Sequence, residues 1–409
     1  MDGLIVEEIL IILCAIVVLS YVFSIVSQFI RIPSVLLLLF AGIGIRALAD
    51  AENFQFNIPE IIVESLGVVG LIMIVLEAGL DLKLGRDRMK LVRDSFLSAI
   101  VIFVLSSALL TAILYYWMNE PVQKCLVYAI PLSIMSSSIV IPSIHHLTRS
   151  KKEFLVYEAS FSDILGILVF NYFTVGEPLT LKAFGFLSVN IIVGVILSVF
   201  LSFLLFIILA KVKLNIKFFL IFSLLILIYS GGKILHLPSL IIILVFGLLI
   251  NNWEKIKFPI LTKFFPHNQV EALRHLLHSI TAESSFLIRT FFFIFFGYSI
   301  SLSFLTEREV IVVGSLLVLG LFAVRLLYLR FFLKTNVFPE SYFIPRGLIT
   351  IVLFYKIPDH LKLTSFNDGI LFFVILTTSI IMALGMIFHK KSPEQVIEEP
   401  QFTERRDIL

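Results

Sequence analysis

The sequence predicts an all-α polytopic membrane protein with about thirteen transmembrane helices, arranged as an inverted-topology repeat. Hydrophobic residues make up 59% of the 409-residue chain and charged residues only 15%, too little polar surface to cover a soluble globule. The apolar stretches run unbroken for about twenty residues, without the alternation of barrel strands. These observations exclude a soluble enzyme, a disordered protein and a nucleic-acid binder.

Thirteen apolar windows are long enough to cross the hydrocarbon of a bilayer. They are centred near residues 15, 40, 70, 106, 135, 165, 197, 223, 244, 292, 320, 350 and 379. The first window is preceded by acidic rather than basic residues, which is the reverse of a secretory signal, so we expect a retained helix. Because the connections are short, any mechanism must lie within the membrane. No cofactor is expected.

The Lys and Arg residues of alternate loops divide 22 to 7. Cytoplasmic loops are enriched in these residues. We therefore expect a multi-pass protein of the cell (inner or plasma) membrane, with its N-terminus outside and a short cytoplasmic tail over residues 390–409. Three further basic residues, Arg289, Arg325 and Arg346, lie within apolar spans.

Two segments share a motif. Pro33 is followed by Ser and, nine residues after the proline, by Gly42; Pro238 is followed in the same way by Gly247, at an offset of 205. The two spans run in opposite directions, so the halves are inverted repeats unless the motif arose by chance. The prediction is a transmembrane domain over 1–389, with repeats at about 1–175 and 215–389 and a linker helix at 180–212.

The same offset relates two polar, proline-bearing interruptions. Ser136–Pro142 of the fifth span corresponds to Ser341–Gly347 of the twelfth. Matching interruptions in two halves indicate a site near the middle of the bilayer, so we expect both helices to unwind there and cross. The alternative is a proline kink satisfied by neighbouring hydroxyl groups.

The sixth span contains two carboxylates, Glu158 and Asp163. Five residues at 100° each place them about 140° apart around the helix axis, so they cannot share one partner. A charge in the bilayer needs a partner or a function. Arg325 is the expected counter-ion of Glu158, in a structural ion pair.

Asp163 is the candidate transport residue because it lies deeper in its span. Its carboxylate, the hydroxyl of Ser162 and the serines of the fifth span, Ser137 and Ser138, would form a hard oxygen site for Na⁺, Li⁺ or K⁺. A proton would compete with the cation for the same carboxylate. Exchange activity should then be bell-shaped in pH, unless Asp163 is only the buried partner of an arginine.

Other intramembrane or interfacial groups leave alternatives open. Arg346 either offsets the dipole ends of the broken helices or anchors the cytoplasmic face. Glu77 has a helix-end, funnel or ion-handling role, and no function is assigned to Arg289. His145 and His146 either sense pH near neutrality or have no special role.

Together these residues resemble the monovalent cation:proton antiporter superfamily over nearly the whole chain, with the closest likeness to the sodium/proton exchanger branch of NhaP and NHE type. The motifs that carry the resemblance are Arg31-Ile-Pro-Ser with Gly42, Leu76-Glu-Ala-Gly-Leu-Asp81, Glu158-x-Ser-Phe-Ser-Asp163, Arg325 and Pro345-Arg-Gly-Leu348. The resemblance implies an NhaA-like antiporter fold and a homodimer, with a core domain moving against a dimerisation domain. It implies that Asp163 binds ion or proton and that Glu158 pairs with Arg325.

Two positions depart from this branch. Ser162 stands where the branch has Asn, and Ser136-Ser-Ser resembles the second antiporter branch, which includes potassium-efflux systems. With one carboxylate at the pair, the resemblance implies electroneutral exchange. We expect an antiporter rather than an enzyme, exchanging Na⁺, ahead of Li⁺, for H⁺ by alternating access. The rivals are a K⁺/H⁺ antiporter or K⁺ efflux pathway and, further away, an organic-anion carrier of similar fold.

Overall fold

The structure is a computed structural model that describes most of the chain. The described residues are 6–30, 32–51, 60–82, 89–144, 147–174, 218–234, 239–255, 267–300, 306–333 and 338–389, with short pieces between 196 and 207. Most of the predicted linker helix at 180–212 and the predicted tail at 390–409 lie outside these residues, as do Arg31, His145 and His146.

Thirteen α-helices and no strand make up the described part of the chain. They are α1 (Val6–Ile30), α2 (Ser34–Ala51), α3 (Glu60–Asp81), α4 (Met89–Met118), α5 (Val122–Ser133), α6 (Ser137–Ser143), α7 (Arg149–Thr174), α9 (Phe218–Ile234), α10 (Ser239–Asn251), α12 (His267–Ser299), α13 (Arg308–Tyr328), α14 (Leu348–Tyr355) and α15 (Asp368–Phe388). This confirms the predicted all-α class. The predicted span near residue 197 falls largely outside the described residues.

Seven of the described helical segments are long and apolar enough to cross a membrane. The pair α5 and α6 counts as one such segment, Val122–Ser143. Helix α7 is long enough but is not among the seven, because carboxylates and serines occupy its middle. The most polar long helix therefore lies inside the bundle, where its polar groups can meet partners.

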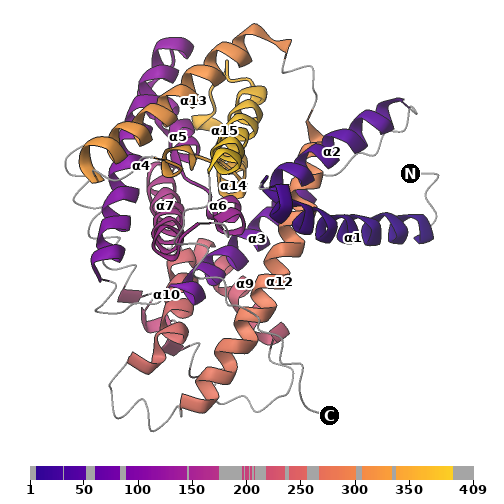
Figure 1. The fold of residues 1–409 in the computed structure, drawn as a ribbon, viewed down its shortest axis with the longest axis vertical. Coiled ribbons are helices and arrows are strands. Elements are labelled where there is room, and N and C mark those ends of the chain that lie inside the picture. The colour runs from indigo at the N-terminus through magenta and orange to yellow at the C-terminus, as the bar shows by residue number, and fades with distance from the viewer. Residues whose placement is uncertain are drawn as a thin grey trace.

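The helices pack as two groups (Figure 1). Helices α4, α5, α6, α7, α13, α14 and α15 form one group, called the core group below. Helices α1, α2, α3, α9, α10 and α12 form the other, called the scaffold group. The two groups meet chiefly where α14 packs against α3, with smaller contacts of α14 with α12 and of α2 with α6 and α15.

Two close glycine crossings hold the scaffold group together, and one glycine of each, Gly42 and Gly247, belongs to the motif that recurs at an offset of 205. Gly42 of α2 lies against Gly297 of α12: a Cβ at Gly42 would come within 2.3 Å of the Ile294 carbonyl oxygen. Its repeat partner Gly247 of α10 lies against Gly79 of α3 in the same manner. Each of the two motif glycines of the sequence therefore lies at a close crossing of two helices.

Both predicted interruptions are unwound, although the first lies nearer the N-terminus than predicted. The unwound residues of the fifth span are Ile134–Ser136, while Ser137–Pro142 belong to α6. In the twelfth span, a short 3-10 helix (η6, Glu340–Tyr342) leads into extended residues 343–347 and then α14. The two unwound segments meet where the Ser136 N–H donates to the Pro345 carbonyl at 3.0 Å. Partners outside the helix, rather than Pro142, decide where it opens.

Candidate functional site

The break between α5 and α6 frees backbone N–H groups that need partners within the protein. Ile134 and Ser136 have extended backbone angles, with ψ of 126° and 112°. The Met135 N–H donates to Ser162 Oγ of α7 at 2.9 Å, and the Ser136 N–H donates to Pro345 O. The unwound backbone is thus held by α7 on one side and by the second unwound segment on the other.

The next freed N–H meets Asp163. The Ser137 N–H donates to Asp163 Oδ2 at 3.3 Å, and the Asp163 side chain is almost fully buried. Asp163 Oδ1 and Ser137 Oγ are buried and have no hydrogen-bond partner among the described residues. One long hydrogen bond does not compensate the burial of an ionised carboxylate, so a proton or a cation is needed to neutralise it.

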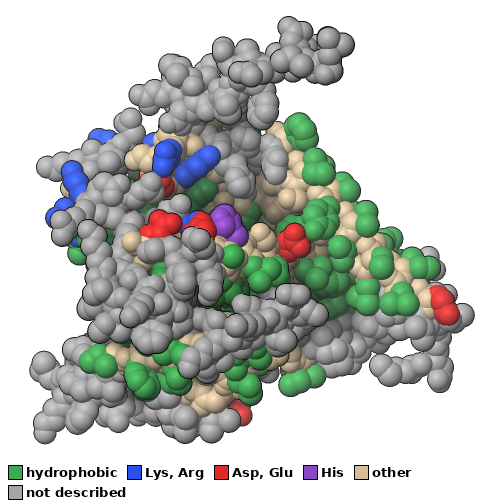
Figure 2. Space-filling model, turned by 90° about the horizontal axis from the view of Figure 1, so that it is seen from below, with side chains coloured by type: hydrophobic (Ala, Val, Ile, Leu, Met, Phe, Trp, Pro, Cys, Tyr) green, Lys and Arg blue, Asp and Glu red, His purple; other side chains and the backbone are tan. Residues whose placement is uncertain are grey.

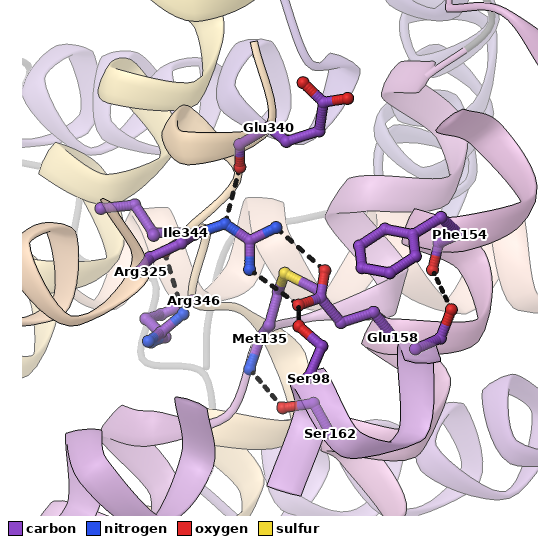
Figure 3. A network of polar contacts seen from close by, with 10 residues as sticks. Ser98, Met135, Phe154, Glu158, Ser162, Arg325, Glu340, Ile344 and Arg346 are labelled. Carbon is purple, nitrogen blue, oxygen red and sulfur yellow. Dashed lines mark hydrogen bonds and ion pairs between the residues drawn. The ribbon is translucent and has the colours of Figure 1, made fainter. Parts of the chain in front are cut away.

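Glu158 lies on another face of α7 and is fully satisfied. Its Oε1 and Oε2 accept from Arg325 Nη1 at 3.1 Å and Nη2 at 2.9 Å, and Oε1 also accepts from Ser98 Oγ of α4 at 2.5 Å. Both charged residues are 1% exposed. Figure 3 shows this bidentate pair with Ser98 beside it. Its geometry is the planar fork typical of a strong arginine–carboxylate contact.

Arg346 lies at the end of α5 and bonds carbonyl oxygens there. Its Nε donates to Leu132 O at 2.5 Å and its Nη1 donates to Ile344 O at 3.0 Å. Thr350 of α14 donates to Pro131 O at 3.0 Å in the same place. The carbonyl end of a helix carries partial negative charge, so a buried guanidinium there offsets the dipole of α5.

The serines of the fifth span differ in what they face. Ser137 presents its N–H to Asp163, whereas Ser138 Oγ bonds Ser136 Oγ at 2.8 Å. Successive residues of a helix point about 100° apart, so Ser137 and Ser138 cannot both face α7. Ser162 is next to Asp163 in sequence but already accepts the Met135 N–H.

A small cavity lies between α4, α5, α7, α13 and the extended residues after η6. Its polar lining comes from both arginines, from Glu158 and from two serines: Ser133, Glu158, Ser162, Arg325 and Arg346. Asp163 does not line it. The two carboxylates of α7 therefore have separate surroundings, as their spacing around the helix requires.

Another polar region lies between α3 and α12. His278 Nε2 lies 3.0 Å from Asp81 Oδ1, and Arg289 is the cation that acts most strongly on Glu77. In the face seen in Figure 2, acidic, basic and histidine side chains gather near the middle, among hydrophobic side chains and residues that are not described. Glu77 of α3 and Arg289 of α12 thus belong to the same polar region between these two helices.

Sequence reasoning missed three residues that complete the network. Ser98 lies in the middle of an apolar helix, Glu340 lies in a short turn after Pro339, and Thr378 of α15 accepts the Arg346 N–H at 3.2 Å. Nothing local distinguishes Ser98 or Thr378 from the many other hydroxyls in these spans. Glu340 carried one signal: it is a carboxylate directly before the predicted unwound segment.

The chain was compared with protein families, curated proteins and solved structures. A family model described as "Sodium/hydrogen exchanger, transmembrane" matches residues 14–389. No curated protein matches the chain. The fold is similar to the structure of the sodium proton antiporter MjNhaP1 from Methanocaldococcus jannaschii at pH 8, with a TM-score of 0.68, 20% identity and coverage of 93% of this chain and 100% of that chain. An electron-microscopy structure of MjNhaP1 gives a TM-score of 0.65, 18% identity and coverage of 98% and 100%.

Proposed function

This chain belongs to the sodium/hydrogen exchanger family, a family of transporters rather than enzymes, and we propose that it exchanges Na⁺, ahead of Li⁺, for H⁺ by alternating access. The observation that carries the proposal is Asp163. It is a deeply buried carboxylate with one long hydrogen bond and an oxygen without a partner in the described structure. Such a group is neutral only when it holds a proton or a cation, and the two compete for it.

In the proposed cycle, Asp163 binds the cation with oxygen ligands that include the Ser137 hydroxyl. Ser162 orients the unwound backbone through Met135. Glu158 and Arg325 stay paired throughout as a structural element, while Arg346 and Thr350 hold the end of α5. Raising the pH first frees Asp163 for the cation and later removes the protons needed for the return step, so activity passes through a maximum.

The proposed motion moves the core group against the scaffold group, in an elevator-like manner. The contact between the groups is concentrated at α14, and the scaffold is locked by its two glycine crossings. We also propose a homodimer in the cell membrane, with the N-terminus outside and the C-terminus in the cytoplasm. The Lys and Arg distribution supports this orientation.

A K⁺/H⁺ antiporter or K⁺ efflux pathway is the second candidate, favoured by the serine-rich start of α6. An organic-anion carrier would need cationic side chains free to meet the substrate. The contacts of Arg325 with Glu158, and of Arg346 with Leu132 and Ile344, weigh against it.

The test is exchange in proteoliposomes, measured by dequenching of an entrapped pH indicator after addition of Na⁺, Li⁺ or K⁺. Asp163→Asn should reduce exchange to the level of empty liposomes, because the variant can neither bind nor release a proton. Ser137→Ala should raise the KM for Na⁺ roughly tenfold, the loss of one oxygen ligand. Ser138→Ala, which alters a hydroxyl bonded elsewhere, should change KM less.

Two results would contradict the proposal. Full exchange by Asp163→Asn would remove Asp163 from the mechanism. A response to K⁺ alone, with none to Na⁺ or Li⁺, would replace the first choice of cation by the second.

A further inference from the structure

A second ion pair lies at the start of α7. Lys151 Nζ lies 2.7 Å from Glu340 Oε1 and also donates to the Phe338 carbonyl at 3.3 Å. The Lys151 side chain is 30% exposed and that of Glu340 only 11%. The pair therefore lies at the edge of the core group, with its carboxylate turned inward.

Glu340 has a further contact through its backbone. Its carbonyl oxygen accepts from Arg325 Nε at 2.6 Å, while Arg325 Nη1 and Nη2 bond Glu158 (Figure 3). In Figure 3 the Glu340 carboxylate points away from Arg325 and only its carbonyl oxygen faces the guanidinium. Glu340 thus joins the two ion pairs, one by its side chain and one by its backbone.

The two ion pairs lie on the same face of α7. Lys151 and Glu158 are seven residues apart, which places them on one face of the helix about two turns from each other. Their partners, Glu340 and Arg325, are bonded to each other. Helix α7 is therefore bonded to η6 through Lys151 and to α13 through Glu158, at points about two helical turns apart.

Glu340, which joins the two ion pairs, is close in sequence to the unwound backbone. Five residues after Glu340, Pro345 accepts the Ser136 N–H, and the next N–H of that segment, from Ser137, meets Asp163. A displacement of Glu340 would move Arg325 and Pro345 together. It would alter the segment that orients the Asp163 site.

We propose that Lys151 and Glu340 are positioning residues for cation exchange, holding Arg325 and the extended segment around Pro345 in the geometry that the Asp163 site requires. This inference rests on the proposed function. The alternative is an ordinary ion pair at the surface, which contributes little. Against it stands the inward-facing Glu340 Oε2, which is buried without a hydrogen-bond partner in the described structure.

The experiment measures KM for Na⁺, the maximal rate, the pH profile and the thermal midpoint for four variants in proteoliposomes. Lys151→Gln and Glu340→Gln each remove the pair, and the double variant Lys151→Glu with Glu340→Lys reverses it. Arg149→Gln is the matched control, since it removes a positive charge from the same turn of α7 whose partner, Glu153, is on the same helix.

We expect each single variant to raise KM about three- to tenfold and to shift the pH profile. Arg149→Gln should do neither, and the charge-reversed pair should restore KM toward the wild-type value. The inference is overturned if the single variants behave as Arg149→Gln does. It is also overturned if they lose rate and thermal midpoint together with an unchanged KM and pH profile, since that describes a structural role only.

If a single variant does not fold, the KM for Na⁺ of the double variant Lys151→Glu with Glu340→Lys tests the inference. A KM near that of the wild type supports the pairing, and a folded protein with raised KM contradicts it. The proposed function fails separately, when wild-type protein shows no exchange that depends on Asp163. Wild-type exchange with unaffected variants removes this inference and leaves the function in place.

Discussion

Two carboxylates of one helix have opposite surroundings, and this contrast supports the different roles that we propose for them. Glu158 has two bonds from Arg325 and one from Ser98. Asp163 has one backbone hydrogen bond and an oxygen without a partner among the described residues. A satisfied buried ion pair is stable in one charge state, so Glu158 is suited to structure and Asp163 to reversible loading.

Outside the spans, Glu120 between α4 and α5 makes stability depend on pH. Hydrogen bonds from the Thr364 hydroxyl and N–H, followed by the contact with Lys124, lower the pKa of the Glu120 carboxyl to about 2. Because the folded-state pKa lies below that of the unfolded chain, about 4.3, the charged form stabilises the fold above that pH. The contribution disappears as pH falls from there toward 2.

Glu120→Gln should therefore lower the thermal midpoint of the purified protein at pH 7, and the gap to the wild type should narrow below about pH 4.3. Scanning fluorimetry across pH 7 to 3 measures both midpoints. Glu254→Gln is the control, because Glu254 is an exposed glutamate in the short 3-10 helix after α10. A gap that is constant across this range would show that the Glu120 charge does not contribute.

At the residue scale, candidates can be selected from sequence only where physics restricts which residues occur at a position. A charged side chain in an apolar span costs free energy unless it has a partner or a function. For this reason the sequence alone indicates Glu158, Asp163, Arg325 and Arg346 as candidates. A serine in such a span needs no partner from another helix, because its hydroxyl can donate a hydrogen bond to a backbone carbonyl of its own helix. Ser98 therefore became visible only when folding placed it beside Glu158.

At the scale of elements, the existence of the breaks could be predicted but the position of the first could not. Prolines and small polar residues indicated both interruptions. The residues that unwind are those whose N–H groups find better partners elsewhere, namely Met135 with Ser162 and Ser136 with Pro345. These partners come from distant parts of the sequence, so no local pattern contains them.

The glycine crossing of α2 and α12 makes a prediction for helix packing. Gly42→Ala places a methyl group 2.3 Å from the Ile294 carbonyl oxygen and 2.9 Å from the Tyr298 nitrogen. Because both are backbone atoms, the helices must separate, at a cost of about 1–3 kcal/mol. The thermal midpoint should fall clearly.

Gly44→Ala is the matched control on the same helix, where an added Cβ has nothing within 4 Å. There the gain in helix propensity, about 0.5–1 kcal/mol, should leave the midpoint equal or higher. Equal effects of the two substitutions would mean that the close crossing does not hold the scaffold group.

For the whole molecule, the sequence predicted the architecture through periodicity and repetition. Apolar windows located the spans, and the offset of 205 related the halves. Periodicity and repetition do not predict which helices form the core group and which the scaffold group, because this depends on which helices pack together; only the family resemblance implied such a division. The contact of α14 with α3 and α12, for example, joins segments that are far apart in the chain.

The charges of the core group predict electroneutral exchange. Glu158 and Arg325 neutralise each other, and in the proposed cycle Arg346 keeps its charge while Asp163 alone exchanges one cation for one proton. Both loaded forms then carry the same net charge. The Na⁺ gradient that balances a given pH gradient should not depend on membrane potential.

This can be measured in proteoliposomes with the potential set by a thiocyanate gradient, which avoids K⁺ because K⁺ is a candidate substrate. If two protons crossed for each Na⁺, one net charge would move per cycle, worth about 2.3 kcal/mol per 100 mV. The balancing Na⁺ gradient would then shift about fifty-fold per 100 mV. An unchanged gradient supports a single exchanging carboxylate. A shift of this size requires a second titrating group, and Glu77 of α3 is the first to substitute, because this carboxylate lies within the membrane helices and interacts electrostatically with Arg289 of α12.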